Sequence, residues 1–320
     1  MSRMLHRLLG PLSTPGPSVG LEIAADRVTA TALKWAKLTP KLTAHASVPL
    51  PEGVLEPTAA GTNMVDRAVV IDAVRSVLGQ LPRRTTRIGL VVPDSVAKVS
   101  FVKFDKVPGR SADLERLVGW QVRKAVPFRV EDAQLAYTPG LRLPGGGQEF
   151  VVALIRRDIV EEYEGVCTAA GVHAGLVDLA TFNLVNAATA MSPPSHADWL
   201  LVHVARDYST LAIVRGQDLI FFRNRPTRTD GDVADLVHQS AMYYEDRLEG
   251  RGMARTVLVT SSDSAGSSDV ARDTLQERLG TEIEGLASGG VTSALGVDAL
   301  ALDRLAAPVG LVMREHLSVA

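Results

Sequence analysis

The sequence predicts an α/β fold of two lobes, and three observations lead to that prediction. The apolar segment Val19–Leu33 has the outline of a β-hairpin, and Trp199–Val214 repeats this outline in the second half of the chain. The chain has 320 residues, which is enough for two hydrophobic cores because domains usually contain about 100–200 residues. Strand patterns alternate with amphipathic helical patterns along the chain, as they do in mixed α/β domains.

Composition excludes several classes of protein. With 46% apolar and 22% charged residues, the chain has the composition of a folded globular protein. Its formal net charge of −2 argues against a general nucleic-acid binder, which needs a basic surface. Cys167 is the single cysteine, so no intramolecular disulfide or cysteine-rich zinc site can form. The seven histidines show no metal-ligand spacing, and we expect no metal.

The first segment, 1–18, is predicted to be an N-terminal tail. Cationic residues interrupt the leucines of Met1–Leu12, so this stretch lacks the continuous apolar run of a signal peptide. A frayed terminus and a short amphipathic turn on a membrane or partner both remain open for it. No later stretch reaches the roughly 18 apolar residues of a membrane span. We therefore expect a cytoplasmic protein.

The first lobe is predicted at 19–86. The hairpin is followed by a strand at Lys41–Val48, and the apolar residues of Val65–Leu78 recur with the helical period. Three strands and a helix are a common opening for a two-lobed α/β protein.

A compact αβ unit is predicted at 87–176, inserted into the first lobe. Its expected elements are two strands within Arg87–Val107, a helix with Ser111 as N-cap that stops before Pro127, the strands Leu135–Leu143 and Glu149–Ile155, and the helix Asp158–Ala170. Gly171 is expected to end the last helix as its C′ residue.

The remaining elements are predicted to return to the first lobe at 177–197 and to form the second lobe at 198–299. A helix is expected at Gly231–Leu248, with Tyr244 on its buried stripe and Tyr243 outside it. The C-terminal segment, 300–320, is expected to be a helix that Pro308 kinks or divides.

Both hairpins contain the turn at which proteins of the actin and sugar-kinase type hold ATP. In those proteins the turn reads Asp-x-Gly: the Asp holds the metal through water, and the Gly lets backbone N–H groups approach a phosphate. This chain has Glu22-Ile23-Ala24 in the first turn and His203-Val204-Ala205 in the second. Alanine replaces both glycines, so we expect the fold without its phosphate binding.

Glu22 and His203 have a simpler interpretation as well. Both could be polar residues at strand ends that face a water-filled cleft, and this remains open beside a retained metal role. His203 could act as a general base. No nucleophile or metal ligand stands near it in the sequence.

Two long segments, WQVRKAVPFRVEDAQLAY at Trp120–Tyr137 and the stretch Glu149–Ala187, are similar to the type IV pilus assembly protein PilM family. The helix end at Pro127-Phe128, the Arg156–Asp158 motif and the Val177–Leu179 segment carry most of this resemblance. The cytosolic domain of the secretion protein GspL is a related family, but it normally continues into a membrane span.

The resemblance implies an actin-like (ribonuclease H-like) fold of two lobes, with an inserted αβ subdomain of the type found in FtsA. It implies a cytoplasmic scaffold, peripheral to the inner membrane, that binds the N-terminal tail of a PilN-like membrane protein. Components of the pilus motor ATPase and a second copy of the chain are further partners that it leaves open. The C-terminal helix is implied to return to the first lobe.

Members of this family commonly bind ATP, and the resemblance places their phosphate and adenosine segments on this chain. The residues of this degenerate nucleotide site are Glu22, Ala24, Ala25, His203, Ala205, Gly231, Ser261, Ser262 and Asp263. Each replacement adds a side chain where backbone would meet nucleotide. A lost contact to charged oxygen costs about 1.5–3 kcal/mol, and micromolar affinity is worth about 8 kcal/mol.

We therefore predict a pseudo-ATPase without catalytic residues or cofactor. The alternative is an actin-like protein with residual ATP binding or hydrolysis, in which ATP and magnesium bind weakly. A sugar or acetate kinase would need the missing Asp-x-Gly turns, and an FtsA-like membrane polymer would need a longer basic C-terminal helix than 308–320.

Partner binding is the function that the resemblance favours. It places a PilN-type peptide in a groove between the first lobe and the inserted unit. Four aromatic residues, Phe101, Phe104, Trp120 and Phe128, could line such a groove, since peptide grooves are apolar with a few polar anchors. Aromatic residues of a small αβ unit are also common in its core.

Overall fold

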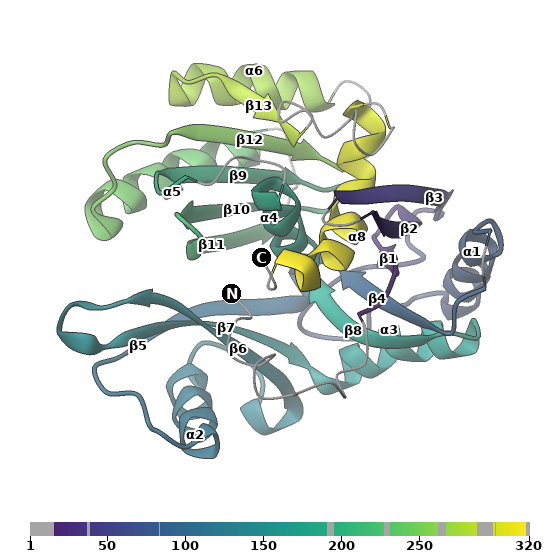
Figure 1. Ribbon diagram of the computed structural model, residues 1–320, viewed down its shortest axis with the longest axis horizontal. Helices are drawn as coiled ribbons and strands as arrows, with labels where there is room; N and C mark the ends of the chain where they lie inside the picture. Colours follow the sequence, from purple (N-terminus) through teal and green to yellow (C-terminus); the bar gives the residue numbers. More distant parts are fainter. Residues whose placement is uncertain are drawn as a thin grey trace.

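The computed structural model describes residues 16–36, 39–82, 84–190, 195–226, 231–261, 267–286, 297 and 299–317. Two five-stranded sheets lie one above the other, with a three-stranded sheet beside them (Figure 1). The first sheet has the order β3-β2-β1-β4-β8 and the second β11-β10-β9-β12-β13. The architecture is the predicted two-lobed α/β fold.

The strands of the first sheet are β1 (Val19–Ile23), β2 (Arg27–Ala36), β3 (Thr39–Pro49), β4 (Arg87–Val92) and β8 (His173–Leu179). Those of the second sheet are β9 (Asp198–Val204), β10 (Tyr208–Arg215), β11 (Asp218–Pro226), β12 (Arg255–Thr260) and β13 (Ile283–Gly285).

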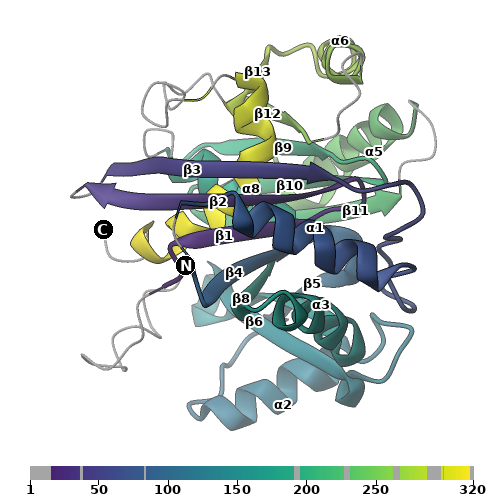
Figure 2. The same ribbon diagram turned by 90° about the vertical axis from the view of Figure 1, so that its right-hand side faces the viewer.

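The two sheets share one helical layer. The helices α4 (Ala180–Ala190) and α8 (Ala299–Leu317) lie between them and bury one apolar cluster with residues of both sheets. On the outer faces lie α1 (Arg67–Gly79) and α3 (Arg157–Ala169) against the first sheet, and α5 (Gly231–Leu248) and α6 (Ser267–Leu279) against the second (Figures 1 and 2). None of the helices among these described residues has both the length and the apolar character of a membrane span.

The inserted unit is smaller than predicted. It consists of the sheet β5-β7-β6 and the helix α2 on one face, with β5 at Ala97–Phe104, α2 at Ser111–Val122, β6 at Ala133–Arg142 and β7 at Gln148–Arg156. The boundary 87–176 is therefore corrected, because β4 and β8 pair in parallel within the first sheet and α3 packs on α1. Alternating polar and apolar residues do not reveal which sheet a strand joins.

The two predicted hairpins have the same geometry. The backbone N–H of Ala24 donates to Arg27 O at 2.9 Å, and Ala205 donates to Tyr208 O at 2.9 Å. Behind these turns, Glu22 pairs with Thr29 in one hairpin and His203 with Thr210 in the other. The structure thus confirms the internal repeat.

Several helix predictions are confirmed and one is corrected. The helix α5 has the predicted bounds, and Tyr244 is buried whereas Tyr243 is exposed. Gly171 adopts φ = +88° directly after the C-cap of α3, as a C′ glycine does. Ser111 is not the N-cap of α2: the cap is Arg110, without a side-chain hydrogen bond, and the helix already ends at Val122.

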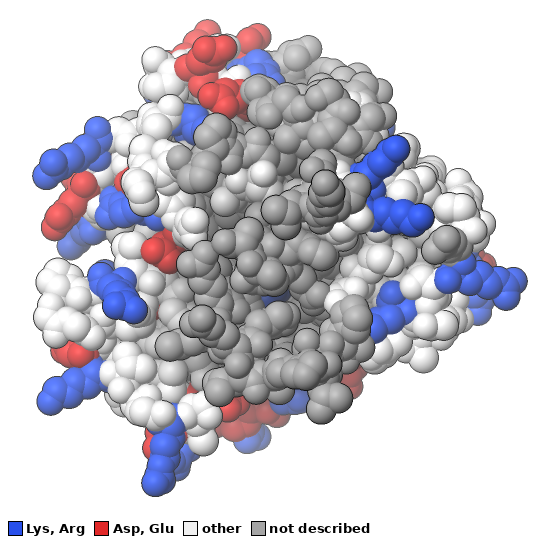
Figure 3. Space-filling model, in the orientation of Figure 1, with Lys and Arg blue, Asp and Glu red and all other residues white. Residues whose placement is uncertain are grey.

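Charged side chains are unevenly spread over the molecule. On the face shown in Figure 3, both signs are interleaved on the left, whereas Lys and Arg gather toward the right edge, where α1 lies in Figure 1. This concentration of cations is local, because the whole chain has a formal net charge of −2.

Glycines allow α8 to approach its neighbours closely. Pro308 lies inside α8 without dividing it, and a Cβ on Gly20 of β1 would overlap the carbonyl of Pro308. A Cβ on Gly89 of β4 would stand 2.6 Å from Leu311 Cδ2. On the other side of the helix, a Cβ on Gly310 would overlap the carbonyl of Asn183 in α4. The close packing of the shared helical layer therefore requires glycine, which has no side chain, at these three positions.

We expect Gly310→Ala to lower the free energy of unfolding by about 1–3 kcal/mol, because the new methyl group must displace α4 from α8. Denaturant titration measures this change. Gly109→Ala is the matched control, since its Cβ would meet no atom within 4 Å and should change stability little. Equal stability of both variants would contradict this account of the helical layer.

Candidate functional site

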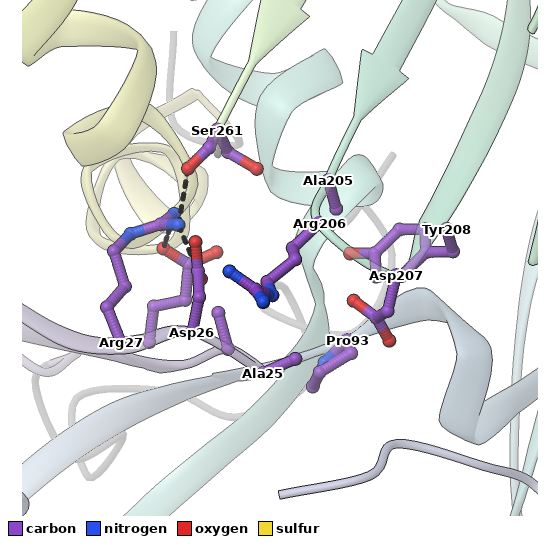
Figure 4. A pocket seen from close by; sticks show the side chains of 11 residues that line it. Ala25, Asp26, Arg27, Pro93, Ala205, Arg206, Asp207, Tyr208 and Ser261 are labelled. Carbon is purple, nitrogen blue, oxygen red and sulfur yellow. Dashed lines mark hydrogen bonds and ion pairs between the residues drawn. The ribbon is translucent and has the colours of Figure 1, made fainter. Parts of the chain in front are cut away.

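The two hairpin turns face each other across a cleft between the lobes. The cleft is lined by the first turn, the second turn and the segments that follow β4 and β12, with Glu22, Ala24, Ala25, Asp26, Arg27, Pro93, Ala205, Arg206, Asp207, Tyr208 and Ser261 as its walls (Figure 4). Its volume is about 10 Å³. A cavity of that size holds about one water molecule.

Arg27 forms one wall of this cleft, and its guanidinium points toward Ser261 of the other lobe (Figure 4). Its side chain is 3% exposed, and its Nη2 lies 3.3 Å from Glu22 Oε2. Its Nη1 lies 3.0 Å from Asp26 Oδ1 and also donates to the backbone carbonyl of Ser261 (Figure 4). Since Arg27 begins β2 and Ser261 follows β12, this contact joins the two lobes.

Burial raises the pKa values of two acidic residues of the cleft. It raises the pKa of Glu22, although the positive charge of Arg27 opposes the shift. Burial also raises the pKa of Asp207 to about 6, with the negative charges of Asp26 and Asp94 adding to it. Three carboxylates, Glu22, Asp26 and Asp207, thus line the cleft together with two arginines, Arg27 and Arg206.

A second network lies behind the turns. Asp94, fully buried directly after β4, accepts hydrogen bonds from Thr181 N at 3.0 Å, from Thr210 Oγ1 at 2.8 Å and from the Thr181 hydroxyl. His203 Nδ1 lies 2.9 Å from Thr181 Oγ1, and its Nε2 lies 3.0 Å from Ser261 Oγ. Like Arg27, this network connects elements of both lobes.

The hydrogen bonds assign the protons of this network. Thr181 has one hydroxyl proton, which it donates to Asp94, so it accepts from His203 Nδ1–H. His203 Nε2 is the second hydrogen-bonding atom of the ring and contacts the Ser261 hydroxyl.

The order serine, histidine, aspartate resembles a nucleophile with its base. Thr181 separates the last two, however, because His203 Nδ1 lies 3.7 Å from Asp94 Oδ2. The adjoining cavity also has room for about one water, so an ester or amide would not fit beside Ser261. The geometry favours a structural network.

The structure brings most of the predicted nucleotide-site residues together. Glu22, Ala24, Ala25, Ala205 and Ser261 line the cleft. His203 lies directly behind it with 1% exposure and contacts Ser261, whereas Glu22 lines the cleft and pairs with Arg27. The interpretation as strand-end residues that face a water-filled cleft is therefore corrected for His203. Gly231 begins α5, and Ser262 and Asp263 lie outside the described residues.

Several residues of the site were missed in the sequence. Arg27 directly follows the first turn at the start of an apolar strand, and Asp94 ends the apolar run IGLVVP in a corresponding way. A charged residue next to a buried strand was an available signal for both. Thr181 and Thr210 give no such signal, because threonine is ordinary in helices and strands.

The four aromatic residues do not line one surface. Phe104 and Phe128 pack in the core between α2 and its sheet, while Phe101 points to the opposite face, toward the layer shared by the lobes. Trp120 on α2 is 67% exposed. Only Trp120 among the four is thus freely available to a partner.

No group of three or more potential metal ligands occurs within the described ranges of the chain. Two carboxylates of the cleft, Glu22 and Asp26, pair with Arg27, and behind the cleft threonines donate to Asp94.

Two sheets around shared helices, with paired hairpins facing across a cleft, define an actin-like α/β protein. The family model described as type IV pilus assembly protein PilM matches residues 20–244. This match covers more than half of the chain, which therefore belongs to that family, and the resemblance stated from the sequence is confirmed.

The chain is also similar to solved structures. The chain is similar to the structure described as a PilM-PilN type IV pilus biogenesis complex, with a TM-score of 0.77, 18% identity, and coverage of 94% of this chain and 99% of that chain. EutJ from Carboxydothermus hydrogenoformans gives a TM-score of 0.49 at 12% identity, with coverage of 96% and 93%. The cytoplasmic domain of EpsL from the type II secretion system of Vibrio cholerae gives 0.45 at 12%, with 85% and 98%. A comparison with curated proteins gives no match.

We expect Asp207→Asn to stabilise the protein at pH 7 by about 1–3 kcal/mol. Because the pKa of Asp207 is raised to about 6, the folded state holds a proton that the unfolded chain releases, and stability falls as the pH rises from about 4 to 6. In the Asp207→Asn variant, the decrease in stability that ionisation of Asp207 causes over this pH range should be absent. Asp303, whose burial raises its pKa to about 6 as well, leaves a residual slope.

Denaturant titrations between pH 4 and 7 measure this difference. Asp72→Asn on the surface of α1 is the control, since Asp72 is 75% exposed, and it should follow the unaltered chain. A stability gain for Asp207→Asn that is equally large at pH 4 would rule out the titration as its cause.

Proposed function

We propose that this chain is a nucleotide-independent adaptor of type IV pilus assembly that binds the N-terminal tail of a PilN-like inner-membrane protein. Membership of the PilM family supports the assembly role. A structure similar in fold over 94% of this chain is described as a complex of PilM with PilN, which supports the choice of partner. In this proposal the chain is cytoplasmic and reaches the inner membrane through that partner.

The closed cleft is the observation that carries nucleotide independence. Its volume is about 10 Å³, whereas pockets for small-molecule ligands usually measure about 300–1,000 Å³. The methyl groups of Ala24 and Ala205 stand in the two turns, and Arg27 occupies the space between the lobes. ATP would have to displace an arginine that is already paired with two carboxylates.

Calorimetric titration of the unaltered protein with ATP and magnesium tests the loss of nucleotide binding. We expect no isotherm, with a Kd weaker than about 1 mM. Residual ATP binding is the other candidate function, and a micromolar isotherm would establish it in place of the pseudo-ATPase.

The junction between the inserted unit and the first lobe is the proposed binding region for the tail. Arg157 at the start of α3 donates to Ala133 O at 3.1 Å and thereby fixes the first residue of β6. Arg156 donates to Ala60 O at the first lobe. The segment that leads from Trp120 to this junction contains the Arg123–Glu131 ion pair at 2.9 Å. Trp120 itself is exposed on α2, and an exposed tryptophan is a suitable anchor for a peptide.

We expect Trp120→Ala to weaken binding of a PilN-tail peptide by about 2 kcal/mol, or roughly thirtyfold in Kd, because a buried tryptophan anchor is lost from the complex. Fluorescence anisotropy of a labelled peptide measures the Kd. Tyr243→Ala removes an aromatic side chain that is 41% exposed on the second lobe, and it should leave the Kd unchanged.

Amide exchange with and without the peptide locates the tail independently. Protection should appear on α2, β6 and the start of α3. Protection confined to the second lobe, or weaker binding by Tyr243→Ala alone, would refute this placement.

Components of the pilus motor and a second copy of the chain remain proposed additional partners.

A further inference from the structure

Arg27 crosses from one lobe to the other in a place where the chain needs no charge for its core. Its guanidinium meets three acceptors: the carboxylates of Glu22 and Asp26 from its own lobe, and the carbonyl of Ser261 from the other. Two of the three are charged, and hydrogen bonds between charged partners are stronger than neutral ones. The side chain is 3% exposed, so solvent screens these contacts little.

The walls of the cleft are complementary to a cation. Three carboxylates, those of Glu22, Asp26 and Asp207, line the cavity. The second cationic side chain of the lining, Arg206, is half exposed and pairs with the exposed Glu52 at 3.3 Å. A phosphate in the place of Arg27 would face three carboxylates with only the half-exposed Arg206 to offset them, whereas a guanidinium there meets attraction.

We propose that the cleft between the lobes is a guanidinium-binding site, which the chain fills with its own Arg27 and which thereby closes the lobes in place of a nucleotide. This inference rests on the proposed nucleotide independence. The planar fork of arginine reaches two carboxylates and a carbonyl together, which the single ammonium of lysine cannot reproduce. Arg27 is thus an internal ligand of the cleft.

The contact acts on one side of the cleft. Behind the turns Asp94 accepts from Thr210 and joins the lobes by a separate contact. Loss of Arg27 should therefore loosen the segment after β12 before it separates the lobes. The backbone N–H of Ser261 reports this loosening, because it donates to Val204 O at 3.0 Å.

Chemical rescue of Arg27→Ala tests the proposal. Hydrogen exchange of the Ser261 amide and thermal unfolding are measured for the full chain with millimolar guanidinium and, separately, with ammonium at equal ionic strength. Arg225→Ala is the matched control, since Arg225 lies on the exposed end of β11 and donates to Gln239.

We expect the Ser261 amide of Arg27→Ala to exchange at least about tenfold faster than in the unaltered chain. Guanidinium should restore slow exchange and raise the unfolding temperature of this variant, and ammonium should not. Neither cation should change the unaltered chain or Arg225→Ala in the same way. Unchanged exchange in Arg27→Ala, or equal rescue by both cations, would overturn the proposal.

Arg27→Lys keeps the test decisive if Arg27→Ala does not fold. Lysine retains the charge without the fork, so the Ser261 amide should again exchange at least about tenfold faster. Exchange equal to that of the unaltered chain would refute a guanidinium-specific site. These measurements are separate from the ATP and peptide titrations. A titration result that contradicts the proposed function would not change the result expected for the contacts of Arg27.

Discussion

The structure depends on the close approach of α8 to both of its neighbouring layers. Two sheets can share one helical layer only if the helices between them lie near each sheet, and side chains limit that distance. Gly20, Gly89 and Gly310 remove the side chains that would otherwise meet α8 or α4. The lobes are thereby brought so close that their hairpin turns face each other. The narrow cleft is thus a consequence of packing in the helical layer as well as of its own residues.

Because the two lobes lie close together, the polar groups buried between them need hydrogen-bonding or charged partners. Polar groups that a nucleotide and its metal would satisfy in a working relative must find partners within the protein, since buried polar atoms without them are costly. Arg27 satisfies Glu22 and Asp26, while Thr181 and Thr210 satisfy Asp94. His203 joins the second group to Ser261. Each lobe therefore supplies part of the environment of the other.

The sequence predicts the local elements well and their assembly less well. Hairpins, α5 and the burial of Tyr244 follow from periodicity, which is a property of neighbouring residues. The extent of the inserted unit does not, because the partners of β4 and β8 in the sheet are distant along the chain. The role of Ala24 and Ala205 could be predicted because it depends on their own turns. That of Thr181 could not, because its partners Asp94 and His203 are distant along the chain. Trp120 lies off the buried stripe of its helix, which contains Val118 and Val122, so periodicity was an available signal for its exposure.

Cys167 has a practical consequence. It lies fully buried in α3, within the core of the first lobe, and burial raises the pKa of its thiol to about 12. A thiol that stays protonated and enclosed is a poor nucleophile toward maleimides and oxidants. A new cysteine placed on the surface of either lobe would then be the one that takes up a dye or spin label, without removal of the native residue. With one such label on each lobe, spectroscopy would measure the distance between the two lobes.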